Sequence, residues 1–132
     1  MALTISHRAH AIMLAAAQSA KPHEACGLLL GTIDHIATAV PTANVAPAPA
    51  RHFEIDPAAL IAAHRAARDG SGLQVIGYFH SHPNGLARPS ATDMACAARD
   101  GRVWVIVAED AITCWHDGMD GFEPLSYSVL QG

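Results

Sequence analysis

The sequence predicts a single α/β (α+β) domain, with a mixed sheet, over residues 1–132. Three observations lead to this prediction. The length of 132 residues suits one compact domain. Apolar residues make up 51% of the chain, enough to form one buried core. Short apolar runs that suit buried strands alternate along the chain with helix-type segments, which is typical of mixed α/β folds.

The expected elements follow from start and stop signals. Ser6 can cap a first helix that ends at Lys21-Pro22, and Asp56-Pro57 is a second helix start. Glycine and proline clusters mark loops at 41–50 and 83–89. The expected helices span residues 5–20, 58–68 and 90–99. The expected strands span residues 25–31, 33–40, 52–55, 73–79, 103–108 and 112–116, with a strand or mixed segment over 122–130.

Composition excludes several classes of function. The formal net charge is −4 and only 8 residues are Lys or Arg, which argues against nucleic-acid or anionic-membrane partners. The run at 9–20 is apolar, but it is shorter than the ~20 residues of a membrane span and does not resemble a signal peptide. The cytoplasm is therefore the expected location. Three cysteines without close spacing are expected to be buried, reduced thiols: Cys26, Cys96 and Cys114.

The stretch 77–93 carries the pattern that points to chemistry. His80 and His82 are two residues apart, so on a strand both imidazoles lie on one face and Ser81 lies on the other. Two neutral imidazoles on one face form a natural chelate for zinc. A loop then leads into a helix whose first turn contains Asp93, and this carboxylate can supply a third ligand. Three protein ligands leave one tetrahedral position open for water, which is typical of catalytic zinc.

A second interpretation of this stretch needs no metal. Ser90-Ala-Thr-Asp93 also matches a capping box, in which a Ser side chain and an acidic residue three positions later cap a helix. The two interpretations compete for one hydroxyl, because a Ser90 side chain that bonds the helix backbone is less free to serve an active site. The residues alone leave both interpretations open.

Taken together, these residues resemble the motif of the JAMM, or MPN-plus, metalloprotease family. That motif is a Glu near the N-terminus, then His-Ser/Thr-His, seven residues, Ser, two residues and Asp. Here it is matched by Glu24, His80-Ser81-His82, Ser90 and Asp93. The resemblance covers nearly the whole chain. It implies a compact, stand-alone domain of the prokaryotic kind, with a curved mixed sheet flanked by helices (cytidine-deaminase-like).

Carried over residue by residue, the resemblance implies one zinc ion per chain, bound by His80, His82 and Asp93. It also implies that Glu24 is the general base and that Ser90 helps to hold the oxyanion. Zinc lowers the pKa of a bound water, a carboxylate takes its proton, and a hydroxyl stabilises the developing negative charge. The role of Glu24 rests on the resemblance alone, because this residue lies 56 positions before His80.

The resemblance also implies a class of substrate. Members of the family cleave peptide or isopeptide bonds after the C-terminal Gly-Gly of ubiquitin-like proteins, and some compact prokaryotic members resemble peptidases that process ubiquitin-like sulfur carriers. Such an extended tail can add as a strand beside a sheet. Three alternatives stay open: a non-catalytic MPN scaffold that binds partners, a zinc hydrolase of another small amide, and a metal-free binding module. The oligomeric state also stays open, a homodimer included.

Overall fold

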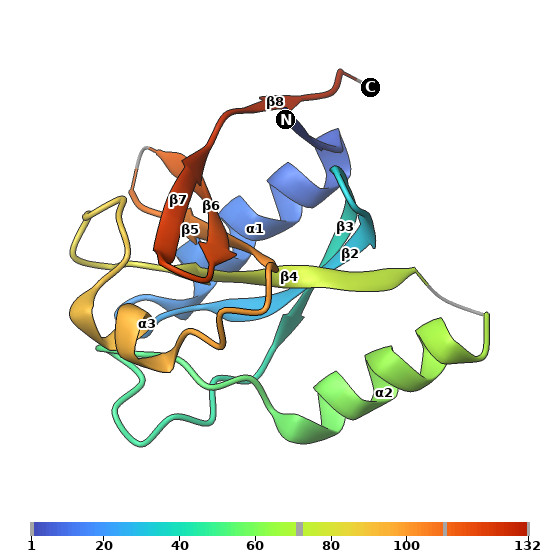
Figure 1. Cartoon of the computed structure of the whole chain (residues 1–132). Helices are drawn as coiled ribbons and strands as arrows, with labels where there is room; N and C mark the ends of the chain where they lie inside the picture. Colours follow the sequence, from blue (N-terminus) through green and yellow to red (C-terminus); the bar gives the residue numbers. More distant parts are fainter. Residues whose placement is uncertain (1, 71–72, 110, 132) are drawn as a thin grey trace.

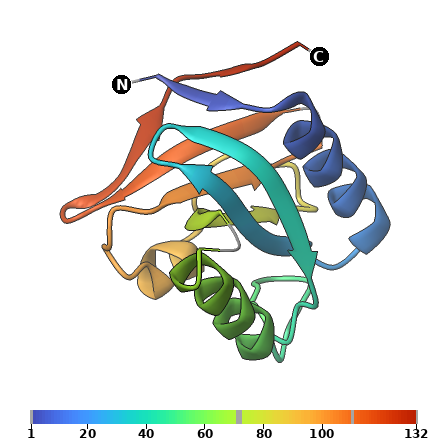
Figure 2. The ribbon, with the colours of Figure 1, turned by 90° about the vertical axis from the view of Figure 1, so that its right-hand side faces the viewer.

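The computed structural model describes residues 2–70, 73–109 and 111–131, and it confirms the mixed α/β architecture. One curved sheet carries helix α1 on one face and helices α2 and α3 on the other (Figures 1 and 2). The strands are β1 (Leu3–Ile5), β2 (Cys26–Thr32), β3 (His35–Thr42), β4 (Gln74–Ser81), β5 (Val103–Val107), β6 (Ile112–Gly118), β7 (Gly121–Leu125) and β8 (Tyr127–Val129). The helices are α1 (His7–Ala20), α2 (Pro57–Arg68) and α3 (Ala91–Cys96). No helix within the described ranges is long and apolar enough to cross a membrane.

Strand β4 lies in the middle of the sheet. The strand order is β7-β6-β5-β4-β2-β3-β1-β8, so β4 pairs antiparallel with β2 and parallel with β5. The pairs β1–β3 and β1–β8 are also parallel, whereas the remaining neighbours are antiparallel. A central strand is fixed by hydrogen bonds on both edges, so its C-terminal end is a rigid place for functional side chains.

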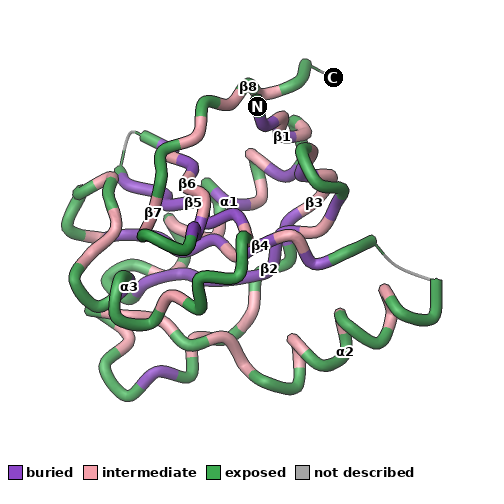
Figure 3. The backbone as a smooth tube through the Cα atoms, viewed as in Figure 1, coloured by how far each residue is buried: buried purple, intermediate pink, exposed green. Residues whose placement is uncertain are grey.

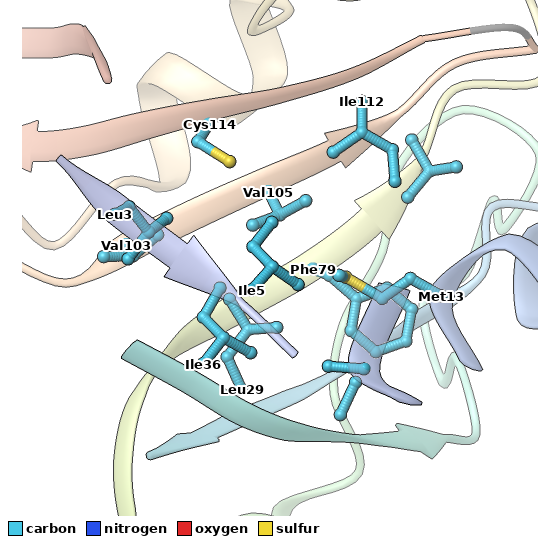
Figure 4. Packing of buried hydrophobic residues seen from close by; sticks show 13 residues of the cluster. Leu3, Ile5, Met13, Leu29, Ile36, Phe79, Val103, Val105, Ile112 and Cys114 are labelled. Carbon is cyan, nitrogen blue, oxygen red and sulfur yellow. The ribbon is translucent and has the colours of Figure 1, made fainter. Parts of the chain in front are cut away.

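The hydrophobic core lies between the sheet and α1. Met13 of α1 packs in one cluster with Phe79 of β4 and with apolar residues from five other strands (Figure 4). Buried positions concentrate on the central strands, while Pro57–Arg68 has no buried residue along its described length (Figure 3). Because successive strand side chains alternate between faces, Phe79 on the α1 face places its neighbours Tyr78 and His80 on the opposite face. That opposite face carries the candidate site.

Several expected elements have different bounds in the structure. Ile5 belongs to β1, and the first helix begins only after Ser6, which accepts a hydrogen bond from the Ala9 N–H. The expected strand at 52–55 is a single bridge between Asn44 and Ile55. The segment 122–130 divides into β7 and β8, and the loop expected from residue 41 begins two residues later.

The third helix is also shorter than expected. It ends at Cys96, and Ala97 is already extended. Beyond it the chain turns toward β6, where the Asp117 carboxylate accepts a hydrogen bond from the Arg99 backbone at 3.1 Å, with Arg99 at a φ of 56°. The bond from Arg99 to buried Asp117 thus holds the chain in a non-helical course, before the glycine at which the helix was expected to end. Cys26 and Cys114 are buried as expected, whereas Cys96 is exposed, which corrects that expectation.

Gly77 allows β4 and β5 to approach closely, and we predict that Gly77→Ala destabilises the fold. A Cβ at this position would lie 1.8 Å from the Val103 carbonyl oxygen, so the two strands would have to separate. We expect the free energy of unfolding, measured by urea denaturation, to fall by about 3 kcal/mol. Gly70→Ala is the matched control, because a Cβ there meets nothing within 4 Å and strains only a φ of 75°, at a cost of about 1 kcal/mol. Equal stability of the Gly77→Ala variant and the wild type would contradict this account.

Candidate metal centre

The site is built at the C-terminal end of β4. Cys26 pairs with His80, and continuing this antiparallel register places Glu24 opposite His82. Two further bonds extend the pairing: the Ser81 N–H donates to the Ala25 carbonyl at 3.0 Å, and the Ala25 N–H donates to Ser81 Oγ at 2.8 Å. Ser81 thus bonds on the face away from the histidines, as the strand geometry predicted, and it holds the segment that carries Glu24 beside them.

Three side chains converge on one point beside this strand end. His80 Nε2 lies 3.0 Å from His82 Nε2 and 3.0 Å from Asp93 Oδ2, and His82 Nε2 lies 3.1 Å from Asp93 Oδ2. All three residues are buried. Ligand atoms ~2.0–2.2 Å from a tetrahedral zinc ion lie about 3.3–3.6 Å apart, so these atoms need to separate by only a few tenths of an ångström. The donor set and its spacing fit a zinc ion.

Asp93 and Ser90 also form the capping box that the sequence offered as the alternative. The Asp93 N–H donates to Ser90 Oγ at 3.0 Å, and the Ser90 N–H donates to Asp93 Oδ2 at 2.9 Å. The two interpretations are compatible in the structure. A hydroxyl has one donor and two acceptor positions, and the cap uses only an acceptor of Ser90. The O–H of Ser90 is left to donate elsewhere.

The Glu24 carboxylate completes the cluster. A carboxylate oxygen of Glu24 lies within 4.8 Å of ring nitrogens of His80 and His82, so by distance Glu24 could itself be a metal ligand. Asp93 is the closer carboxylate, at 3.0–3.1 Å from the two histidines. Glu24 Oε1 is buried and has no hydrogen-bond partner among the described residues. This position would suit a group that acts beside an ion bound by the histidines.

The pKa values of the two carboxylates are shifted in opposite directions. Burial raises the pKa of Glu24 to about 7, an effect that His82 opposes and Asp93 reinforces. Burial would also raise the pKa of Asp93, but hydrogen bonds with His80 and His82 hold that pKa well below its usual range. Burial lowers the pKa of His80 despite the adjacent Asp93, which favours the neutral imidazole that binds metals. One carboxylate is therefore kept ionised, and the other can exchange a proton near neutral pH.

Two hollows open onto Glu24. One is a cleft of about 600 Å³ that also contains His82, Ser90, Arg51 and Arg88. The other, of about 450 Å³, lies toward the end of α1 and is lined largely by small side chains. Glu24 is the only described residue that lines both hollows. A chain crossing from one hollow to the other would pass the carboxylate.

Sequence reasoning missed the residues that hold this cluster in place. The His82 Nδ1–H donates to the Leu86 carbonyl at 2.7 Å, which orients the ring with Nε2 toward the cluster. Phe53 stacks on His80, with ring centroids 4.3 Å apart. Asn44 Nδ2 donates to the Glu24 carbonyl at 3.0 Å. Only the position of Asn44 in a proline-rich loop offered a sequence signal for any of these contacts.

Comparison with known proteins assigns the family. Residues 6–117 match the family described as prokaryotic homologs of the JAB domain. The chain belongs to this family. The matched range of this JAB-domain protein contains every residue of the cluster, from Glu24 to Asp93. The family resemblance predicted from the sequence is confirmed.

Relatives of this JAB-domain protein include enzymes named for cleaving protein conjugates. The chain is 35% identical over 111 residues to the desampylase of Haloferax volcanii, covering 82% of this chain and 79% of that protein. It is 35% identical over 91 residues to a probable TtuB-protein conjugate cleaving protease of Thermus thermophilus, covering 69% of this chain and 60% of the relative. A solution structure of a Desulfitobacterium hafniense protein superposes with a TM-score of 0.86 at 29% identity, covering 98% of this chain and 94% of that one.

Proposed function

We propose that this protein is a zinc-dependent metallopeptidase that hydrolyses the amide bond after the C-terminal Gly-Gly of a ubiquitin-like or sulfur-carrier protein. The observation that carries the proposal is the convergence of His80, His82 and Asp93, with the Glu24 carboxylate beside them. Relatives named as a desampylase and as a conjugate-cleaving protease support the substrate class.

The ligand assignment follows the distances. His80, His82 and Asp93 would hold one zinc ion through Nε2, Nε2 and Oδ2, the three atoms that converge. A zinc ion bound there supplies Lewis acidity, which polarises the scissile carbonyl and makes a water molecule more acidic. Three protein ligands leave a coordination position for substrate or water.

Glu24 and Ser90 supply the proton transfer and the charge stabilisation. Glu24 takes a proton from the attacking water and returns it to the leaving amine, which suits a buried carboxyl whose pKa is raised to about 7. The Ser90 O–H, left free by the cap, donates a hydrogen bond to the carbonyl oxygen as negative charge develops on it. Ser90 and Glu24 line the same cleft, so both reach one substrate.

The hollow beyond Glu24 supports a glycine-rich tail as substrate. Its lining includes four small residues, Ala16, Ser19, Ala20 and Ala25. They leave room for a peptide chain but make few contacts with large side chains. β1 pairs with β3 only at His35 and Ile36, which leaves room for an extended peptide beside the end of β3 that contributes Thr42 to this hollow. A tail ending in Gly-Gly suits a hollow lined by small side chains.

The test is cleavage of carriers extended beyond Gly-Gly by the zinc-loaded protein, followed by mass spectrometry. We expect release of the extension from a ubiquitin-like sulfur carrier and no release when Gly-Gly is replaced by Val-Val, because the branched side chains would meet the lining of the hollow. Binding without cleavage would instead indicate a scaffold. Cleavage of short amides but not of carriers would indicate another amide hydrolase.

A further inference from the structure

Apart from the contacts of its Nε2 with His82 and Asp93, the His80 ring is packed against aromatic side chains. It is fully buried, and its ring stacks on Phe53 with centroids 4.3 Å apart and planes 21° apart. Trp104 meets the same imidazole edge-on, at 5.7 Å and 90°. Phe53 and Trp104 also contact each other edge-to-face at 5.6 Å. The imidazole therefore has one ring against its plane and another at its edge.

The two histidines of the site are held in different ways. His82 Nδ1–H donates to the Leu86 carbonyl, so a hydrogen bond fixes its ring orientation. His80 Nδ1 is buried and has no hydrogen-bond partner among the described residues. Metal-binding histidines almost always use their second nitrogen for such a bond, which orients the ring. His80 needs another source of orientation.

We infer that Phe53 is the positioning residue for His80, and that stacking replaces the missing hydrogen bond; this inference rests on the proposed metal site. A ring held at 4.3 Å blocks rotation of the imidazole about its Cβ–Cγ bond, because a rotated ring would strike the phenyl plane. Phe53 also lines a hollow of about 400 Å³ beside Asp93. Removing the phenyl ring would open space into which the imidazole can turn.

Asn44 holds Phe53 in place and connects it to the proposed base. Its Nδ2 donates to the His52 carbonyl at 3.1 Å and to the Glu24 carbonyl at 3.0 Å, and its Oδ1 accepts from the Glu54 N–H at 3.0 Å. The residues on both sides of Phe53 are thus bonded to one side chain. This side chain also bonds the backbone of Glu24, so the stacking ring and the base share one anchor.

The test compares Phe53→Leu with Phe53→Tyr and with Phe122→Leu. Leucine keeps an apolar side chain but removes the flat ring, and tyrosine restores the ring. Phe122 is the matched control, since it contacts Trp104 at 4.9 Å and its only ring contact among the described residues is with that tryptophan. For Phe53→Leu we expect zinc affinity, measured by competition with a chromophoric chelator, to fall about tenfold or more. We expect kcat to fall while KM changes little, and Phe53→Tyr to retain both properties.

Two readouts need no substrate, so failure of this inference is separate from failure of the proposed function. In metal-free protein, ¹⁵N ring shifts of His80 should report one ring state in the wild type and averaged states in Phe53→Leu. Asn44→Ala, which keeps the phenyl ring but frees its loop, should give a smaller loss of zinc affinity in the same direction. Unchanged zinc affinity in Phe53→Leu would overturn the inference. An equal loss in Phe122→Leu would overturn it as well, because the effect would then be general destabilisation.

Discussion

Replacing Glu24 by Gln is expected to abolish most of the hydrolysis while leaving the fold intact. Glutamine has nearly the same shape but cannot accept a proton from water, so only the proposed base is removed. The catalysed rate should fall by about 10³-fold, equivalent to roughly 4 kcal/mol of transition-state stabilisation. The measurement is kcat on a carrier extended beyond Gly-Gly. Glu123→Gln is the matched control, because Glu123 is an exposed glutamate at 71% side-chain exposure, and it should cleave normally.

Zinc content separates the two roles open to Glu24. Its carboxylate lies within 4.8 Å of the histidine nitrogens, close enough for a metal ligand. If Asp93 is the third ligand and Glu24 is the base, the Glu24→Gln variant should bind about one zinc ion per chain, as the wild type should. Loss of zinc from this variant would move Glu24 into the ligand set. Normal cleavage by a zinc-loaded variant would remove it from the mechanism.

The same variant should change the pH dependence of stability in metal-free protein. The pKa of Glu24 rises from 4.5 to about 7 on folding, so the folded state binds the proton more tightly than the unfolded state. This contribution to stability is complete below pH 4.5 and is lost as the pH rises through about 7. Glutamine cannot ionise, so the variant should gain roughly 2 kcal/mol relative to wild type between pH 5 and pH 8. Urea denaturation at the two pH values measures this difference.

The local parts of the site could be predicted from the sequence. His80 and His82 share a face because a strand repeats every two residues, and the structure places their Nε2 atoms 3.0 Å apart. Asp93 lies in the first turn of a helix that follows a short loop, and its carboxylate reaches both histidines. These relations depend on neighbours within 13 residues, where spacing and secondary structure determine position.

The remaining parts depend on partners that are distant in the chain. Glu24 reaches His82 only through the register of β2 on β4, and nothing in its own neighbourhood indicates that register. Strand β1 is three residues long and forms only because β3 and β8 flank it. The stacking of Phe53 on His80 likewise requires the bonds that Asn44 makes across a loop. Non-local pairing of this kind leaves little trace in local propensity.

Replacing His80 by Ala is expected to remove zinc and activity together. If the ~10–16 kcal/mol that binds a four-ligand structural zinc site is shared evenly, one ligand contributes about 3 kcal/mol, so affinity should weaken by at least about 100-fold. The wild type should carry about one zinc ion per chain, measured by atomic emission after dialysis. Cleavage of the carrier should disappear at zinc concentrations that saturate the wild type.

The matched control for this loss is His64→Ala, because His64 is an exposed histidine on α2. It should retain both zinc and cleavage. This result would show that zinc binding depends on the position of the histidine and not on the number of histidines. The His80→Ala variant also leaves a cavity between Phe53 and Trp104, so its unfolding should be followed in parallel. A folded His80→Ala variant with wild-type zinc affinity would mean that the metal lies elsewhere. A folded His80→Ala variant without zinc would instead show that the metal binds at the end of β4, because unfolding would then not explain the loss of zinc.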